Sequence, residues 1–397
     1  MEDKVGIVWG KWGPYHYARC NALANLIGKQ RCIGIALADK SDIYHWKAVD
    51  DDGSGAEVIT LNKNSAQEKL NPLKAAYQLY RTLKKRQIKV VFLPSYWPAR
   101  SLAILLASKL AGAKCIMMNE SHAGTENAKG FAKWIKRQLI KLFDAALVGG
   151  SPQRDYFTSM GMSAEKIFLG YDAVDNDYFS RSSGEIKRNE EVVRQRLGLP
   201  RSYILNLGRF VAKKNLSTLI NAYAAFTQGE SAADTALVLV GSGEEEEMLR
   251  SLAIEKGLRV KDLVPDTIPV GARTVFFAGF RNIDENPAFF SLADLFVLPS
   301  LKEEWGLVVN EAMACGLPVI VSERVGCARD LVKEGINGSQ FDPLNVKSLA
   351  DTIEAIANSK AVKEAMGRKS TEIISDWGCP LFASNANAAI LYVLNKK

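Results

Sequence analysis

Residues 299–322, PSLKEEWGLVVNEAMACGLPVIVS, decide how the second half of this chain folds. They follow a short apolar run, 295–298, that has the composition of a buried parallel strand. A polar turn comes next, then an apolar-rich segment that stops at Gly316 with Pro318 just beyond, as helices commonly stop. Residues 317–321 are again strand-like. The stretch therefore predicts a strand–loop–helix–strand unit of an open parallel sheet.

Two acids in this stretch, Glu303 and Glu311, are candidate ligand contacts. If the helix starts near Gly306, its free N–H groups can hold an anion. Glu311 would then lie roughly 7–8 Å along the helix axis from Gly306. A diphosphate at the helix terminus would have one carboxylate near each end, which suits a nucleotide-sugar. The alternative is an acidic turn followed by a solvated helix glutamate.

The same stretch resembles the signature of glycosyltransferase family 4. The resemblance lies in the E-x7-E spacing from Glu303 to Glu311, the E-x-W-G start and the E-A-M-A-C-G-L-P-V finish. It implies an α/β protein of the GT-B fold, with two Rossmann-like parallel-sheet domains facing each other across a cleft. It also implies a retaining enzyme that uses a nucleotide-sugar. The likeness covers nearly the whole chain, most strongly residues 203–343 and more weakly those before 115.

Length and composition agree with a large globular protein. A chain of 397 residues predicts two domains, and 47% hydrophobic with 24% charged residues is a globular composition. We find no run of eighteen apolar residues, and residues 1–4 lead directly into an apolar strand, so we expect neither a membrane span nor a signal peptide. The six cysteines form no C-x-x-C pair, which predicts reduced thiols in a cytoplasmic protein.

The predicted domains are 1–195, which would bind the acceptor, and 196–377, which would bind the nucleotide-sugar. A final helix, 378–397, is expected to pack back on the first domain. Residues 180–195 are polar without a strand pattern, so they predict a linker. The net charge of +7 is uneven, because residues 1–180 hold 25 Lys and Arg against 17 Asp and Glu, an excess of +8. This distribution predicts an anionic partner for the first half.

Several candidate contacts lie after predicted strands of the first half. The loop 10–16 joins a strand to a helix, and the family resemblance implies a donor contact by Gly13. Tyr15, His16, Tyr96 and Glu120 are candidates for acceptor binding. An ordinary structural turn is the alternative for the loop 10–16.

A histidine and two basic residues complete the catalytic candidates. His122 follows a strand end, where family members carry a histidine that reaches the transferred sugar or its phosphate; a structural role is the alternative. Arg209 and Lys214 are five residues apart across a strand-to-helix loop, so both can converge on a diphosphate. They match the R-x4-K pair of the family, whose usual glycine after the lysine is Asn215 here.

The resemblance also assigns the remaining donor contacts. Glu303 would hold the sugar ring and Glu311 the ribose. The donor-binding set is completed by Phe280, Arg281, Trp305, Gly306 and Leu307. The D-x-D spellings at 50–52 and 175–177 lie in a turn and a linker, so we expect no metal site. No cofactor is expected beyond the nucleotide-sugar itself, with UDP-linked donors favoured over GDP- or ADP-linked ones.

These features predict a retaining hexosyltransferase that acts on a glycan or lipid-linked acceptor hydroxyl in polysaccharide or glycolipid biosynthesis of the cell envelope. Arg209, Lys214 and the helix terminus at Gly306 would oppose the charge on the leaving diphosphate in place of a metal. A sugar phosphorylase, a sugar-nucleotide epimerase and a non-catalytic sugar-binding homologue are the alternatives.

A basic amphipathic helix over 129–143 bears on localisation. Phe131 and Trp134 fall on one side of the helical wheel and most lysines on the other. Its apolar side can dock on its own domain, or it can contact an anionic membrane. The sequence thus predicts a cytoplasmic protein, a candidate for peripheral attachment to the inner face of the cell membrane, and no nucleic-acid partner.

Overall fold

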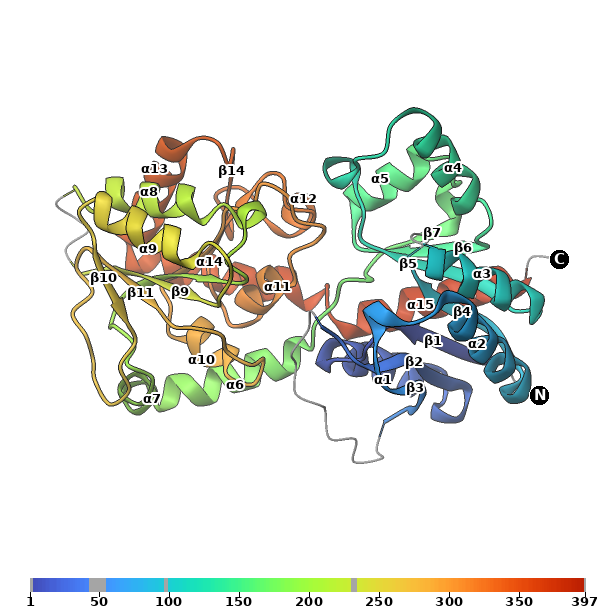
Figure 1. Cartoon of the computed structure of the whole chain (residues 1–397). Coiled ribbons are helices and arrows are strands. Elements are labelled where there is room, and N and C mark those ends of the chain that lie inside the picture. The colour runs from blue at the N-terminus through green and yellow to red at the C-terminus, as the bar shows by residue number, and fades with distance from the viewer. Residues whose placement is uncertain (1–2, 43–54, 96–98, 230–233, 396–397) are drawn as a thin grey trace. The chain divides into compact units, whose positions relative to one another are not determined.

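The computed structural model describes residues 3–42, 55–95, 99–229 and 234–395 (Figure 1). The chain divides into unit 1, Met1–Asp175 with Trp377–Lys397, and unit 2, Asn176–Asp376. Each unit is built on a seven-stranded sheet, and the strand pairs within both sheets are parallel. The predicted pair of parallel-sheet domains is confirmed. Across the described residues, no helix combines the length and the apolar character that a membrane crossing requires.

Unit 1 has the strand order β3-β2-β1-β4-β5-β6-β7. Its strands are β1 (Lys4–Trp9), β2 (Cys32–Lys40), β3 (Glu57–Ala66), β4 (Ile88–Pro94), β5 (Lys114–Asn119), β6 (Ala145–Val148) and β7 (Ile167–Phe168). Its helices are α1 (Pro14–Ile27), α2 (Pro72–Arg86), α3 (Ala99–Leu110), α4 (Gly130–Ile140), α5 (Ser151–Ser159) and α15 (Cys379–Asn395), with short 3-10 turns η1 (Lys29–Arg31), η2 (Gln67–Lys69), η3 (Ala123–Thr125) and η4 (Ala164–Lys166).

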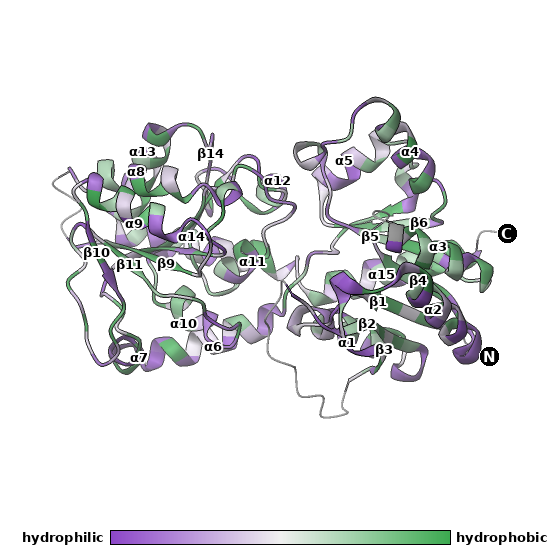
Figure 2. Cartoon of the chain, viewed as in Figure 1, coloured by the Kyte–Doolittle hydropathy of each residue, from purple (hydrophilic) through white to green (hydrophobic). Residues whose placement is uncertain are grey.

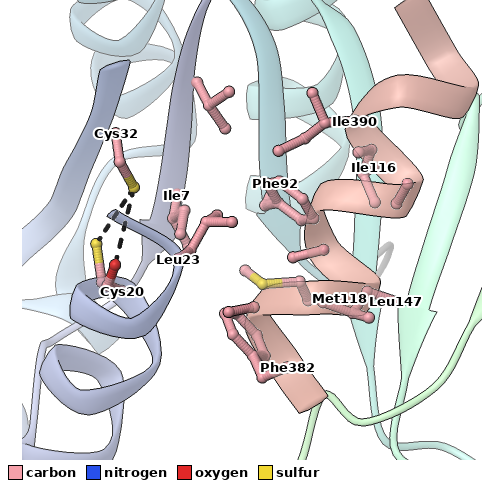
Figure 3. Packing of buried hydrophobic residues seen from close by; sticks show 14 of the residues in the cluster. Ile7, Cys20, Leu23, Cys32, Phe92, Ile116, Met118, Leu147, Phe382 and Ile390 are labelled. Atoms are coloured by element: carbon pink, nitrogen blue, oxygen red, sulfur yellow. Dashed lines mark hydrogen bonds between the residues drawn. The ribbon is translucent and has the colours of Figure 1, made fainter. Parts of the chain in front are cut away.

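The sheet of unit 1 is covered on both faces. Helices α1 and α15 pack on one face, where Phe382 and Ile390 of α15 lie beside Phe92 and Met118 of the strands (Figure 3). Helices α2, α3, α4 and α5 contribute buried residues to the opposite face. The last helix of the chain is therefore part of the first unit, because its apolar residues complete the core on the α1 face.

All six cysteines are buried thiols, as the sequence predicts. The Sγ atoms of Cys20 and Cys32 are 3.8 Å apart, and Figure 3 shows the contact. Burial raises the pKa of the Cys115 and Cys315 thiols to about 12. These two side chains are consequently neutral core residues and poor nucleophiles at neutral pH.

Unit 2 has the strand order β10-β11-β9-β8-β12-β13-β14. Its strands are β8 (Tyr203–Leu207), β9 (Ala236–Val240), β10 (Arg259–Asp262), β11 (Thr274–Phe277), β12 (Leu295–Leu298), β13 (Val319–Ser322) and β14 (Gly338–Phe341). Its helices are α6 (Asn176–Arg188), α7 (Glu190–Leu197), α8 (Leu216–Phe226), α9 (Glu246–Glu255), α10 (Asn286–Ser291), α11 (Leu307–Ala314), α12 (Ala328–Leu331), α13 (Val346–Ala357) and α14 (Lys360–Ser375), with the turn η5 (Ala212–Lys214). Hydrophobic residues concentrate in the strands, as Figure 2 shows for β9 and β11.

The predicted linker over 180–195 is wrong, because α6 and α7 occupy this segment. The boundary between the units lies at Asp175 instead of residue 195. Ser183 of α6 donates a hydrogen bond to the carbonyl of Cys315 at 3.2 Å, and the buried Arg194 of α7 donates to Leu292 at 2.9 Å. Each helix buries one apolar and one polar residue, Phe179 and Ser183 in α6 and Val193 and Arg194 in α7, so few apolar positions mark the helical period in the sequence.

Each sheet contains a point where the strand order reverses. In unit 2, β8 lies between β9 and β12, so the chain leaves β8 toward one side and later returns on the other. In unit 1, β1 lies in the same way between β2 and β4. Loops that leave a parallel sheet in opposite directions open a crevice at the carboxyl ends of the strands, where ligands bind.

Candidate active site

At the reversal point of unit 2, the structure brings together Lys214 after β8 and Glu303 after β12. The Lys214 ammonium forms an ion pair with the Glu303 carboxylate, and the two side chains are 13% and 14% exposed. Ser300 Oγ donates to the same carboxylate at 3.3 Å. The two loops are also joined by the Leu301 N–H, which donates to the carbonyl of Lys213 at 2.8 Å. Two residues predicted separately are thus held as one charged group.

Asn215 stands where the family usually has a glycine after the lysine, and its conformation shows how it can replace that glycine. Its backbone is left-handed, with φ 54° and ψ 40°, a conformation that asparagine tolerates better than most residues. Its side-chain amide donates to the carbonyls of Pro299 at 3.1 Å and Pro343 at 2.9 Å. Asparagine therefore provides the same turn as glycine and also fixes Lys214 against the loop after β12.

The glycines of the G-x-G at 241–243 support the loop that carries Arg209. A Cβ on Gly241 would lie 1.8 Å from the carbonyl oxygen of Gly208, and one on Gly243 would lie 2.3 Å from that of Phe210. Such close approach requires glycine at both positions. Arg209 itself is exposed, and we find no ion pair for it among the described residues. Its guanidinium is accessible to an anionic ligand.

Helix α11 begins at Leu307, as predicted, with Gly306 as its N-cap at φ 101° and ψ 60°. A Cβ at Gly306 would be 3.0 Å from Val325 Cγ1 and 3.1 Å from a methyl carbon of Leu298, so the turn has no space for a side chain. The first N–H groups of a helix have no intrahelical acceptor, and the helix dipole adds positive potential there. This terminus is therefore suited to an anion.

Trp305 and Glu311 are both buried beside this terminus. Trp305 is 1% exposed, and its indole N–H donates to Asn310 Oδ1 at 2.9 Å, so it stabilises the turn into α11. Glu311 is 1% exposed. The pKa of Cys315 is raised first by the burial of that thiol and then by the nearby Glu311. Burying a carboxylate is costly, and such groups concentrate at functional sites.

Phe280 and Arg281 follow β11, which is separated from β8 by β9. The Phe280 ring is 54% exposed and accessible for stacking on a planar group. Arg281 forms an ion pair with Glu285 at 3.4 Å and lies over the Phe289 ring at 5.7 Å. The arginine is thus held against α10, whereas the phenylalanine faces solvent.

In unit 1, the loop after β1 holds a neutral histidine. Gly13 is the N-cap of α1, and its N–H donates to His16 Nδ1 at 2.9 Å. The Trp9 ring lies 4.7 Å from the imidazole. Burial lowers the pKa of His16 to about 3, and the nearby Arg19 contributes to the shift. His16 can therefore exchange hydrogen bonds with a hydroxyl group but carries no charge at neutral pH.

The neighbouring residues of this loop have different surroundings. Trp12 is buried, and its indole N–H donates to the carbonyl of Ile35 at 3.1 Å. Gly34 makes room for it, because a Cβ there would lie 2.3 Å from the Trp12 ring. Tyr15 is half-buried near the start of α1. Trp12 is thus a core residue, and Tyr15 stays a candidate acceptor contact.

His122 is 7% exposed and forms the N-cap of η3 after β5. Its Nδ1 accepts the N–H of Gly124 at 3.2 Å, so in the neutral ring the proton lies on Nε2, which can donate. The same loop is fixed by Glu126, which accepts from Lys136 at 2.8 Å and from the Tyr156 hydroxyl. Burial raises the pKa of Glu126, but these hydrogen bonds outweigh burial and lower the pKa to about 2.

Glu120 belongs to an acidic pair that the sequence did not reveal. Burial raises the pKa of Asp172 well above its usual range, Glu120 raises it further, and Arg19 opposes the shift. Arg19 Nη2 lies 4.0 Å from Asp172 Oδ1, and its Nε donates to the carbonyl of Ala173 at 2.8 Å. Asp172 and Glu120 are far apart in the chain, so spacing gave no signal for the pair. Tyr96 and residues 50–52 lie outside the described residues.

Comparison with known proteins shows a family likeness in unit 2. Residues 188–373, which lie within this unit, match the family model of glycosyl transferases group 1. Unit 2 is thus similar to the group 1 glycosyltransferases over nearly its whole length. The resemblance seen in the sequence is confirmed at this level, and enzymes of this group use nucleotide sugars.

Curated relatives extend over the rest of the chain. The chain is 27% identical over 389 residues to a mannosyltransferase of Mycobacterium tuberculosis, and the match covers 94% of each chain. That relative is named a GDP-mannose-dependent alpha-(1-6)-phosphatidylinositol monomannoside mannosyltransferase. An alpha-D-kanosaminyltransferase of Streptomyces kanamyceticus is 26% identical over 281 residues, which are 70% of this chain and 68% of the relative.

A solved structure supports the fold. Anabaena Alr3699/HepE in complex with UDP and glucose superposes with a TM-score of 0.70 at 18% identity, over 98% of this chain and 99% of that one. Together with the two seven-stranded parallel sheets, this likeness confirms the GT-B fold class.

Proposed function

We propose that this glycosyltransferase moves a sugar from a nucleotide-diphosphate sugar to a hydroxyl of a glycan or lipid-linked acceptor, with retention at the anomeric carbon and without a metal. The proposal places the enzyme in the assembly of an envelope polysaccharide or glycolipid. The observation that carries it is the grouping of Lys214, Glu303, the α11 terminus and the buried Glu311 at the reversal point of one sheet.

In this proposal, unit 2 opposes the negative charge of the leaving diphosphate. An ammonium has three N–H donors, so Lys214 can bond to Glu303 and still donate to phosphate oxygens. Arg209 offers a planar fork for two phosphate oxygens. The unbonded N–H groups at the start of α11 add a third positive element. Fixed donors directed at developing charge are among the strongest contributions to catalysis.

The carboxylates are assigned to hydroxyl groups. Glu303 is oriented by Lys214 and Ser300, so it would accept a hydrogen bond from the sugar ring in a fixed direction. Its ion pair weakens it as a nucleophile. Glu311 is assigned to the ribose. In unit 1, His122 Nε2–H is assigned to an oxygen of the sugar or phosphate, and His16 and Tyr15 to the acceptor.

Retention would follow from displacement on one face of the sugar. The bond from the anomeric carbon to the phosphate oxygen breaks, and the acceptor oxygen bonds to the same face. The acceptor proton passes to the leaving phosphate oxygen, which becomes more basic as its bond breaks. This route needs no protein nucleophile, and Lys214 and Arg209 stabilise the diphosphate that remains.

The apolar side of the segment 129–143 is only partly covered: Ile135 and Leu139 are half-buried and Phe143 is buried, whereas the two aromatic residues near its start are exposed. Phe131 is 73% and Trp134 54% exposed, and their rings stack at 5.5 Å. Ile140, on the basic side of the predicted wheel, is buried instead. The peripheral membrane contact through 129–143 that the sequence suggested stays a prediction.

A donor panel tests the function directly. Thermal shift against UDP-, GDP- and ADP-linked sugars should show stabilisation by one nucleotide-sugar, and UDP-linked donors are the predicted class. Nuclear magnetic resonance of the product formed with that donor should show the anomeric configuration of the donor. An inverted product, or turnover that requires free phosphate, would contradict the proposal.

A further inference from the structure

The solvent side of α2 and α3 in unit 1 is unusually apolar. Both helices pack on the same face of the sheet through residues such as Leu79, Leu83 and Ile104. On their outer sides, Leu73 and Leu110 are each 77% exposed, Tyr77 is 60% exposed and Leu106 is 48% exposed. These four residues define the α2–α3 surface. They are four of the nine large hydrophobic side chains that are exposed among the described residues of unit 1.

A groove follows this surface between the two helices. Its volume is about 500 Å³, and the side chains that line it are all Leu, Ala or Tyr. Figure 2 shows hydrophobic residues along α3 and a mixture of hydrophobic and hydrophilic residues along α2. Exposed apolar patches of this kind on a folded domain mark interaction sites.

The charges of the surrounding helices have one sign. Between Pro72 and Arg86, α2 contains five basic residues and no acidic one, and α3 adds Arg100 and Lys109. Arg86 pairs with Glu57 and Lys109 with Asp144. The remaining basic residues of α2 are exposed and form no ion pair among the described residues: Lys74, Arg81, Lys84 and Lys85.

We propose that the α2–α3 surface docks this enzyme on an anionic lipid membrane. Its leucines and Tyr77 would enter the interface between headgroups and acyl chains, and the four basic residues of α2 would contact anionic headgroups. Leucine and tyrosine beside lysine and arginine form the composition of interfacial helices. A second copy is a poorer partner, because a two-fold interface would bring the same positive charges together. The purpose of this docking would be to bring the enzyme to a lipid-linked acceptor, and in this respect the proposal rests on the proposed function.

Vesicle cosedimentation tests the surface. The purified chain should sediment with vesicles of phosphatidylcholine and phosphatidylglycerol, should stay in solution with phosphatidylcholine alone, and should be released by high salt. A chain that ignores the anionic vesicles at low salt would overturn the proposal.

Two variants separate the charge from the apolar contribution. The charge variant combines Lys74→Gln, Arg81→Gln, Lys84→Gln and Lys85→Gln, and it should bind at least about tenfold more weakly, since each basic residue near an anionic surface contributes about fivefold. The apolar variant combines Leu73→Gln, Tyr77→Gln and Leu110→Gln, and it should lose binding that persists at moderate salt. All these side chains are exposed, so the fold should remain.

Matched controls lie on unit 2. The charge control replaces four exposed lysines by glutamine: Lys256, Lys261, Lys347 and Lys360. The apolar control replaces three exposed residues by glutamine: Val192, Ile254 and Val270. Both controls should bind vesicles more tightly than the corresponding variants. Equal binding of control and variant would show that only total charge or hydrophobicity matters, and would overturn the proposal.

Two further measurements exclude the other occupants. The variant Phe131→Ser with Trp134→Ser should retain binding; if it abolishes binding while the α2–α3 variants retain it, α4 is the docking element and the proposal is wrong. Light scattering should show the same mass for wild type and the apolar variant, because a dimer lost on substitution would identify a second copy as the occupant. Release of nucleoside diphosphate without vesicles reports the proposed function separately, so either conclusion can fail alone.

Discussion

Both units are built on a seven-stranded parallel sheet, but they place their charged residues differently. In unit 2, charge lies at the carboxyl ends of the strands, where Lys214 and Glu303 form a nearly buried pair beside the α11 terminus. In unit 1, the loops at the corresponding end hold His16, which is neutral, and His122, whose Nδ1 accepts a backbone N–H. The positive charge of unit 1 lies on its helices instead, above all on α2.

Under the proposed function, the excess charge of the first half has no direct part in holding the diphosphate. A diphosphate needs fixed positive groups, which unit 2 places at a reversal point. A hydroxyl acceptor needs hydrogen-bond donors and acceptors without net charge, which the neutral imidazole of His16 supplies. The basic helices of unit 1 are then available to a third partner, besides the donor and the acceptor.

The largest expected effect tests the charged site of unit 2. Lys214→Ala and Arg209→Ala should each lower kcat on the order of 100- to 1000-fold, since one fixed donor to developing charge is worth about 2.7–4 kcal/mol. Lys213→Ala is the matched control, because Lys213 pairs with Glu304 at 3.2 Å in the same loop. Steady-state release of nucleoside diphosphate measures all three. Wild-type rates in the first two variants would remove the basis of the comparison.

A smaller effect is expected from the buried acid of the same site. Glu311→Gln keeps the volume of a side chain that is 1% exposed but removes its charge. The KM for the donor should rise about 10- to 100-fold, the range for a hydrogen bond to a charged group, while kcat changes little because the ribose does not react. A fall in kcat with an unchanged KM would place Glu311 at the reacting sugar.

Unit 1 should show its neutral histidine in the pH dependence of stability. The folded pKa of His16 is about 3, below its usual value near 6.5, so the unfolded chain binds more protons between these values. Its contribution to the free energy of unfolding should therefore fall as pH drops below 6.5, by at most about 1.4 kcal/mol per pH unit. Urea unfolding of the wild type and His16→Gln at several pH values measures this. Identical slopes from pH 6.5 to 5 would contradict a neutral His16.

The smallest expected effect concerns metal removal, which should leave turnover unchanged. Turnover should survive EDTA, because Lys214, Arg209 and the α11 terminus supply the positive charge that a metal would otherwise provide. Parallel assays with EDTA, and with EDTA followed by excess Mn²⁺, measure this. Activity that disappears with chelator and returns with Mn²⁺ would mean that the charge of unit 2 alone does not suffice.

Strands and glycine turns could be predicted well from the sequence. The strand–loop–helix–strand unit at 295–321 appears with α11 starting at Leu307, because buried strands and a glycine-bounded helix have strong local patterns. Helices α6 and α7 were missed because each buries only one apolar residue, beside a polar one such as Arg194. The exposed ring of Phe131 was uncertain for a related reason, since periodicity gives the faces of a helix but not which face is covered.

The sequence by itself determined the two parallel-sheet domains, the family, and the identity of the candidate site residues. These properties depend on local patterns and motif spacing, which are present in one dimension. Only the tertiary structure decided that Lys214 pairs with Glu303, that Glu120 raises the pKa of Asp172, and that α2 and α3 expose an apolar groove. Each of these involves segments that are separated in the chain and meet only through strand order and helix packing, so spacing alone could not determine them.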